Sequence, residues 1–249
     1  MQNEALSYID MGADFYLRVM GDAEHMELRD NGLYETMQSR GDINNLASVY
    51  NMRLEGLSSD ALVDVIDEIR ELRMHTWWPL SASDRVLLAI HGKIPAYTPD
   101  DFEIYGIMPP GELPEYAATP AHVKIERVET LGNFAVWCDL DNNTEHHGTV
   151  IFHAQNHMHL IESGKLTAFL GLVDGVHVAT CGILNNNGIA SLEFVSTLPD
   201  FRKRDLAAAL CQNALRYTFS RGTKVVTTRA IGSGRTLCKA LGFRIITTE

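Results

Sequence analysis

The sequence predicts a mixed α/β protein in which helices flank a β-sheet. Two observations carry this prediction. Two apolar, strand-like stretches within 166–184 are joined by Asp174-Gly175, a pair typical of tight hairpin turns. A β-branched stretch, 189–197, is followed by an Ala/Leu-rich helical stretch at 205–220. A meander of strands that leads into a strand and a helix indicates one sheet covered by helices.

The front of the chain contains shorter elements of both kinds. Residues 2–20 are expected to form a helix, and Asp30-Asn31-Gly32 is a hairpin signal between two short strands, His25–Leu28 and Leu33–Met37. Apolar residues recur at helical spacing over 60–73, and either Ser58 or Ser59 is expected to cap this helix. The remaining elements expected in this half are a strand at 47–54 and a short helix at 83–91.

A proline-rich connector separates this half from the rest. Six prolines fall between residues 95 and 120, which predicts irregular structure and a domain boundary near 118. We therefore expect an N-terminal α+β region, 1–118, and a second domain, 119–249, with the front region a candidate for a diverged copy of the same fold. Strands are further expected at 122–128, 223–228 and 243–248, and helices at 130–137, 151–163 and 233–240.

Composition limits the class of protein. The 249 residues are 45% hydrophobic and 21% charged, with no apolar run long enough for a membrane span and no secretory pattern after Met1. Four scattered cysteines without a C-x-x-C pair fit reduced thiols in a cytoplasmic protein. Residues 1–119 carry 21 acidic and 8 basic side chains, a net −13. This charge argues against nucleic acid as a partner and favours a cationic or amine substrate, unless the acids serve only solubility.

The turn before the Ala/Leu-rich helix has the features of a phosphate site. A strand that feeds a helix directs the free N–H groups and the positive dipole end of that helix beyond the strand. Three cations lie in the same turn, at Arg202, Lys203 and Arg204. We expect the N–H groups of residues 203–207 to hold a pyrophosphate there, although a merely solvated basic turn has the same sequence.

At these residues the chain resembles the GNAT superfamily of N-acetyltransferases. The family's Arg/Gln-x-x-Gly-x-Gly/Ala turn is matched at Arg202 and Ala207, while the central glycine is replaced by Asp205. About thirty residues later, 236–243 (TLCKALGF) is similar to the family's closing segment, with Cys238 where tyrosine is usual. The resemblance covers the C-terminal half and implies a soluble, acetyl-CoA-dependent transferase of GNAT fold that acetylates a primary amine of a small molecule or peptide.

The resemblance also implies where the co-substrate and the chemistry lie. The strand at 189–197 is splayed from its neighbour in this family, and its free backbone groups pair with the pantetheine arm of acetyl-CoA. Glu193 is the carboxylate of that strand and the candidate general base, sharing a face with Val195 and Thr197 by simple alternation. The residues expected to bind the cofactor are Phe194, Val195, Thr197, Arg202, Lys203, Arg204, Asp205, Leu206 and Ala207.

Three alternatives stay open at this point. Asp205 either caps the helix, competing with the phosphate for its amides, or directs its carboxylate away. Cys238 is either the proton donor to the leaving thiolate or a small buried hydrophobe. His153 and His157 have a helical metal-binding spacing, but without a nearby carboxylate or cysteine motif we expect no metal site. A catalytically degenerate module that binds or regulates is therefore the alternative function, and a homodimer is one assembly that the sequence leaves open.

Overall fold

The computed structural model confirms a mixed α/β protein with helices packed on sheets. It divides into two compact units, an N-terminal one up to Phe102 and a C-terminal one from Glu103 on. The residues that the structure describes are 2–21, 26–40, 47–94, 104–114, 122–144 and 152–246.

The N-terminal unit has a four-stranded sheet in the order β1-β2-β3-β4. Its first three strands form an antiparallel meander, and β4 runs parallel to β3 after the crossover through α2. The elements are α1 (Gln2–Gly21), β1 (Met26–Asp30), β2 (Glu35–Ser39), β3 (Ala47–Tyr50), α2 (Ser59–Glu71), β4 (His75–Thr76) and α3 (Asp84–Lys93).

Local sequence signals account for most of this unit. The hairpin between β1 and β2 forms at the predicted turn, where Asn31 Oδ1 accepts hydrogen bonds from the N–H groups of Leu33 and Tyr34. Of the two serines expected as its cap, helix α2 uses Ser58, whose Oγ accepts a hydrogen bond from Ala61 N–H. Strand β3 ends earlier than expected because the next residue, Asn51, has a φ of 50° and turns the chain.

Asp14 on α1 is a source of pH-dependent stability in this unit. Burial raises its pKa from 3.8 to about 6, against the opposing effect of a hydrogen bond from Asn51 N–H at 3.0 Å. The folded state then binds the proton more tightly than the unfolded state, so stability falls as pH rises from about 4 to about 6. We expect Asp14→Asn to raise the unfolding free energy of this unit by about 1–3 kcal/mol at pH 8 and to leave it nearly unchanged at pH 4.

Urea denaturation at the two pH values measures this effect. Asparagine keeps an oxygen that accepts the bond from Asn51, so the substitution removes the charge and little else. The matched control is Asp64→Asn on the exposed side of α2, which should change stability equally little at both pH values. An Asp14→Asn gain of the same size at pH 4 and pH 8 would show that the effect is not ionisation.

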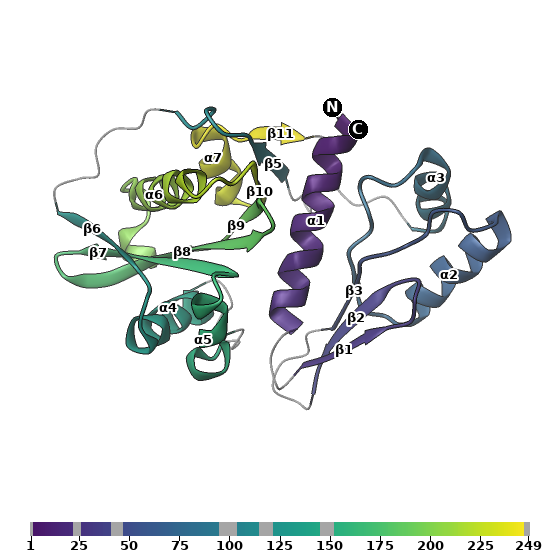
Figure 1. Ribbon diagram of the computed structural model, residues 1–249, viewed down its shortest axis with the longest axis horizontal. Helices are drawn as coiled ribbons and strands as arrows, with labels where there is room; N and C mark the ends of the chain where they lie inside the picture. The colour runs from purple at the N-terminus through teal and green to yellow at the C-terminus, as the bar shows by residue number, and fades with distance from the viewer. Residues whose placement is uncertain are drawn as a thin grey trace. The chain divides into compact units, whose positions relative to one another are not determined.

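The C-terminal unit has a seven-stranded mixed sheet in the order β11-β5-β10-β9-β8-β7-β6. Figure 1 shows α6 and α7 on one face of this sheet and α4 and α5 on the other. The elements are β5 (Ile104–Met108), β6 (Val123–Arg127), α4 (Leu131–Thr144), α5 (Ala154–Glu162), β7 (Leu166–Val173), β8 (Val176–Asn186), β9 (Ile189–Thr197), α6 (Leu206–Ser220), β10 (Val225–Ala230), α7 (Ser233–Ala240) and β11 (Arg244–Ile246).

Strand β5 was not expected from the sequence. It lies in the proline-rich connector, yet it pairs antiparallel with both β10 and β11 inside the C-terminal sheet. The compact units consequently divide at residue 102, whereas the predicted boundary lay near 118. The reason is tertiary: the backbone groups of β5 are satisfied by two strands that follow it by more than a hundred residues.

The two units share an order of elements. In each, a helix precedes an antiparallel three-stranded meander, a crossover helix follows, and the next strand lies parallel to the third strand of the meander. The N-terminal series is α1, β1–β3, α2, β4 and α3, and the C-terminal series is α5, β7–β9, α6, β10 and α7. This agreement supports the expectation that the front half is a diverged copy of the C-terminal fold. None of the described helices has an apolar stretch of the length that a membrane span requires.

Candidate active site

Strands β9 and β10 part from each other half-way along their length. Their parallel pairing begins at Ile189 and Val225 and stops at the pair Leu192–Thr228. Beyond this point β9 continues through Thr197, and no described strand pairs with it on that side. An extended ligand can therefore bind to this side of β9 by adding main-chain hydrogen bonds.

A β-bulge in β9 accompanies the separation. Phe194 and Val195 together oppose the single residue Cys181 of β8, and Phe194 has a φ of 56°. Two side chains bond the backbone carbonyls at the bulge: Thr180 Oγ1 donates to the Phe194 carbonyl at 3.0 Å, and Trp137 Nε1 donates to the Cys181 carbonyl at 3.3 Å. A bulge bends its strand and increases the local twist, so it directs the end of β9 away from β10.

Gly182 provides the space for this bulge. A Cβ atom at this position would lie 2.8 Å from Cδ2 of Phe194 and 3.3 Å from the Trp137 ring. The Phe194 ring packs against the rings of Trp137 and Phe152, with centroid distances of 5.6 and 4.9 Å. The bulge is thus held from the α4 side of the sheet by packing and by hydrogen bonds.

The bulge also changes which side chains share a face. Simple alternation placed Glu193, Val195 and Thr197 together, and this expectation is wrong. Val195 packs against the core cluster that contains α6 residues, whereas Glu193 lies on the face of Ser191, which donates a hydrogen bond to its Oε1. The additional residue in β9 reverses the alternation, so Glu193 is separated by the sheet from the side chain two positions later.

Glu193 is buried beside a cation. Its side chain and that of Arg229 on β10 are each 9% exposed, and Arg229 Nη2 lies 3.6 Å from Glu193 Oε2. Glu193 thus occupies the point where the two strands separate, with an ion pair across the gap. Arg229 was not among the predicted site residues, although it is the one charged residue in the apolar and threonine-rich strand β10.

The basic turn before α6 presents open backbone donors. Lys203 and Asp205 both have positive φ values, of 60° and 57°, and the first helical bond runs from Ala209 N–H to the Asp205 carbonyl. The N–H groups of residues 203–207 donate to none of the described residues. Successive amides in such alternating conformations, together with a helix start, form an anion-binding concavity.

Asp205 does not close this concavity. Its side chain is exposed and makes no hydrogen bond to the helix amides, which removes the capping alternative. The residue instead supplies the left-handed backbone conformation that glycine gives most easily. Its carboxylate still places a negative charge at the start of α6.

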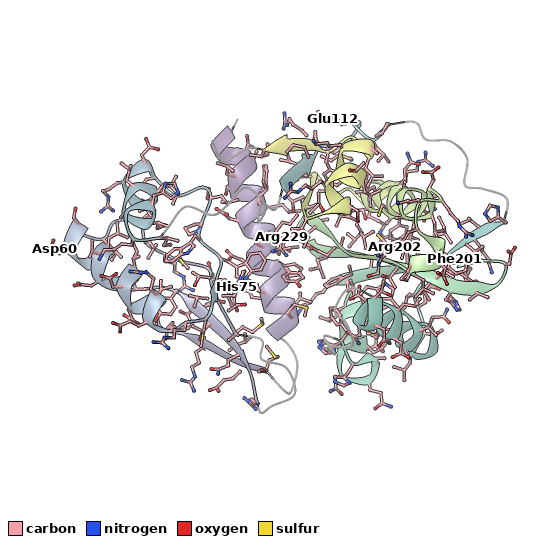
Figure 2. The ribbon with its side chains drawn as sticks, turned by 180° about the vertical axis from the view of Figure 1, so that it is seen from behind. Asp60, His75, Glu112, Phe201, Arg202 and Arg229 are labelled. Carbon is pink, nitrogen blue, oxygen red and sulfur yellow. The ribbon has the colours of Figure 1, made fainter. Side chains whose placement is uncertain are left out.

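The three cations of the turn have different surroundings. Arg202 Nε donates to the Thr197 carbonyl at 2.8 Å, which ties the turn to the end of β9. The Arg204 guanidinium lies over the Phe201 ring, 5.3 Å from its centroid, and Lys203 is exposed. Figure 2 shows Phe201 and Arg202 side by side at this turn.

The point where β9 and β10 separate, called the fork below, and the basic turn before α6 both lie in a segment that matches a family model. Residues 130–241 match the model described as acetyltransferase (GNAT) family. They form a GNAT acetyltransferase domain. No curated protein matches the chain in sequence.

Three solved structures resemble most of the chain. A GCN5-related N-acetyltransferase from Kribbella flavida has a TM-score of 0.65 at 16% identity, over 94% of this chain and 91% of that one. A GCN5-related N-acetyltransferase from Sphaerobacter thermophilus has a TM-score of 0.59 at 17% identity, over 87% and 79%. A tandem GNAT protein from the clavulanic acid biosynthesis pathway also has a TM-score of 0.59, at 14% identity over 94% and 92%. These likenesses show a shared fold, and the tandem protein agrees with the two similar units described above.

Cys238 of the GNAT domain lies in the core on the α7 side. It is 4% exposed, and its Sγ lies 4.0 Å from Thr228 Oγ1. Burial raises its pKa to about 11, so the thiol stays protonated at neutral pH. Burial thus raises the pKa of this thiol past the value near 10 that is ordinary for tyrosine, so the thiol is no stronger an acid than a tyrosine at this position would be.

The corresponding helix start in the N-terminal unit differs from that of the GNAT domain. At α2 a first-turn amide, that of Ala61, is already bonded to Ser58. Residues 54–60 contain no lysine or arginine, and they include the acidic side chains of Glu55 and Asp60. Of the two similar crossover helices, α6 is the one that combines open amides with cations.

Proposed function

We propose that this chain transfers the acetyl group of acetyl-CoA to an amine. The observation that carries the proposal is the combination of a cationic, uncapped start of α6 with the fork between β9 and β10. The first suits the pyrophosphate of the co-substrate and the second suits its extended pantetheine arm. The proposal keeps the cofactor contacts at Phe194, Val195 and Thr197 and at residues 202–207.

The residues at the fork suit acyl transfer by direct attack. The neutral amine attacks the thioester carbonyl carbon, the new C–N bond forms, and the C–S bond breaks to release the CoA thiolate. In the proposed mechanism Glu193 takes a proton from the amine, because it is the carboxylate beside the fork. A proton must also reach the thiolate, and Cys238 is the candidate donor by its position on α7.

A second candidate function is a degenerate module of GNAT fold. Two observations favour it: Asp205 places a negative charge where a diphosphate would bind, and the usual tyrosine position is occupied by the buried Cys238. Such a module would bind acetyl-CoA weakly or would bind it without turnover. Under either function, we propose that residues 1–118 help to bind the acceptor, which is a small molecule or a peptide. We also propose that the protein is cytoplasmic.

Calorimetric titration with acetyl-CoA tests the proposal, and Asp205→Gly sharpens it. Glycine keeps the positive φ of this position and removes the charge next to the diphosphate. We expect saturable binding to the natural chain, with one molecule bound per chain because α2 lacks an equivalent site. We expect the dissociation constant to fall about 5- to 30-fold in the variant, because loss of the carboxylate removes a repulsion of the diphosphate on the order of 1–2 kcal/mol.

The matched control is Asp174→Gly. Asp174 is also an exposed aspartate with a positive φ, of 50°, but it lies in the hairpin between β7 and β8. This variant should leave acetyl-CoA affinity unchanged. Binding that appears only in Asp205→Gly would favour the degenerate module, and binding in neither chain would reject the proposed cofactor site.

A further inference from the structure

The ion pair between Glu193 and Arg229 lies at the position where the next residue pair of β9 and β10 would be, if the two strands stayed together. Pairing between β9 and β10 ends at Leu192 and Thr228, and Glu193 and Arg229 are the residues that follow on each strand. Their charged groups approach to 3.6 Å, and each side chain is 9% exposed. Figure 2 labels Arg229 among the side chains of the C-terminal unit. Opposite charges therefore meet at the site to which the proposed function assigns the acetyl group.

The distance between the two charged groups is typical of a site that can bind a ligand, rather than of an ion pair that stabilises the fold. A buried carboxylate and guanidinium lose much hydration energy, and their attraction returns it only when the contacts are short and well aligned. Charge-assisted contacts of that kind are about 2.7–2.9 Å long, and arginine often makes two of them to one carboxylate. The contact between Arg229 and Glu193 is longer, so a ligand carboxylate in good geometry can displace it at low cost.

The ion pair also opposes the proposed role of Glu193 as a general base, unless a ligand separates Glu193 from Arg229. A neighbouring guanidinium favours the charged form of a carboxylate and so makes it a weaker base. General-base catalysis works best when the base is matched to the working pH. A second carboxylate, supplied by the acceptor itself, would draw Arg229 away from Glu193 as the amine arrives.

We propose that the acceptor is an amine that carries a carboxylate close to the amino group, as an α-amino acid does. Arg229 binds the carboxylate, and Glu193 binds the amino group and takes its proton. One ion pair is thereby exchanged for two, and the net charge of the site does not change when the zwitterion enters. This inference rests on the proposed acetyl transfer and narrows its acceptor to one chemical class.

The charges of Glu193 and Arg229 also explain how the acetylated product is released. Glu193 takes a first proton from the ammonium group, which leaves the neutral amine, and passes this proton to water. The amine nitrogen then bonds to the acetyl carbon, the C–S bond breaks, and a second proton leaves the nitrogen as the amide forms, while the CoA thiolate gains one. The acetylated product keeps its carboxylate on Arg229 but no longer has an ammonium group. Once Glu193 has given up both protons, one to water and one toward the thiolate, it is again an anion that competes with the product for Arg229.

A panel of matched probes tests this inference. The probes are the common L-α-amino acids, their carboxamides, and the corresponding amines without the carboxylate. Binding is measured by calorimetry in the presence of CoA, and transfer by release of CoA thiol. We expect the natural chain to prefer at least one amino acid over its carboxamide by about 100-fold in binding or in kcat/KM, the effect of a well-formed carboxylate–arginine contact.

Variants at Arg229 assign that preference to its side chain. Arg229→Gln should reduce the preference to about 3-fold or less, and Arg229→Lys should retain part of it as a single point charge. The control is Arg244→Gln, an exposed arginine of β11 in the same unit, which should keep the full preference. If Arg229→Gln fails to fold because Glu193 loses the guanidinium beside it, the double variant Glu193→Gln/Arg229→Gln removes both charges and is used for the binding measurement.

The results separate this inference from the proposed function. The inference is overturned if the chain acetylates amines without preferring those that carry a carboxylate. It is also overturned if the preference survives Arg229→Gln. In both cases the proposed function still holds. Absence of acetyl-CoA binding overturns the proposed function itself. Amino-acid binding that depends on Arg229 without turnover supports the acceptor class and shifts the function to the degenerate module.

Discussion

Glu193→Gln is expected to lower kcat for acetyl transfer by about 10²- to 10⁴-fold, the contribution typical of a positioned general base. Glutamine has nearly the same shape and can accept the hydrogen bond from Ser191, but it cannot take a proton from the amine. Acetyl-CoA affinity should stay within about 2-fold, because the proposed contacts to the co-substrate come from the backbone of β9 and from the turn before α6.

The pH dependence distinguishes a base from a structural residue. If Glu193 is the base, the acid limb of the kcat/KM profile disappears in the variant, whereas a purely structural effect lowers the rate equally at all pH values. The control is Asp174→Asn, the same carboxylate-to-amide change in an exposed turn. A profile that keeps its acid limb after Glu193→Gln would remove this residue from the mechanism.

The parts of the C-terminal unit that the sequence predicts well are those set by neighbouring residues. The hairpin at Asp174-Gly175, the strand at 189–197 and the helix that follows it all depend on local turn chemistry and on apolar periodicity. The basic turn at 202–204 also follows from adjacent residues. These features form irrespective of what packs against them, so a single sequence contains the information to find them.

Features that depend on distant residues were missed. Strand β5 is a short segment of 5 residues that is followed directly by Pro109 and Pro110, and it pairs with strands more than a hundred residues later. The bulge at Phe194 depends on side chains from α4 and β8, and without it simple alternation assigns Val195 to the wrong face. Arg229 becomes notable only when β10 is placed beside β9, since an isolated arginine in a strand has many ordinary explanations.

Trp137 is the residue on which we expect the fork to depend most for its stability. Its side chain is completely buried, stacks on Phe134 and bonds the Cys181 carbonyl opposite the bulge. Trp137→Ala should destabilise the C-terminal unit by about 3–5 kcal/mol, the usual cost of truncating a buried aromatic side chain, as measured by urea denaturation. This large change combines two losses, packing and a hydrogen bond to a buried carbonyl.

Trp137→Phe separates these two losses. Phenylalanine keeps most of the ring contacts but has no donor for the Cys181 carbonyl, so we expect a cost of about 1–3 kcal/mol and a weaker bulge. Phe134→Leu is the matched control, because it reduces packing in the same cluster without touching that hydrogen bond. If the bulge keeps β9 separated from β10, acetyl-CoA binding should weaken in Trp137→Phe and not in Phe134→Leu. Equal loss of binding in both would mean that packing on α4, not the bond at the bulge, maintains the opening in which the co-substrate is proposed to lie.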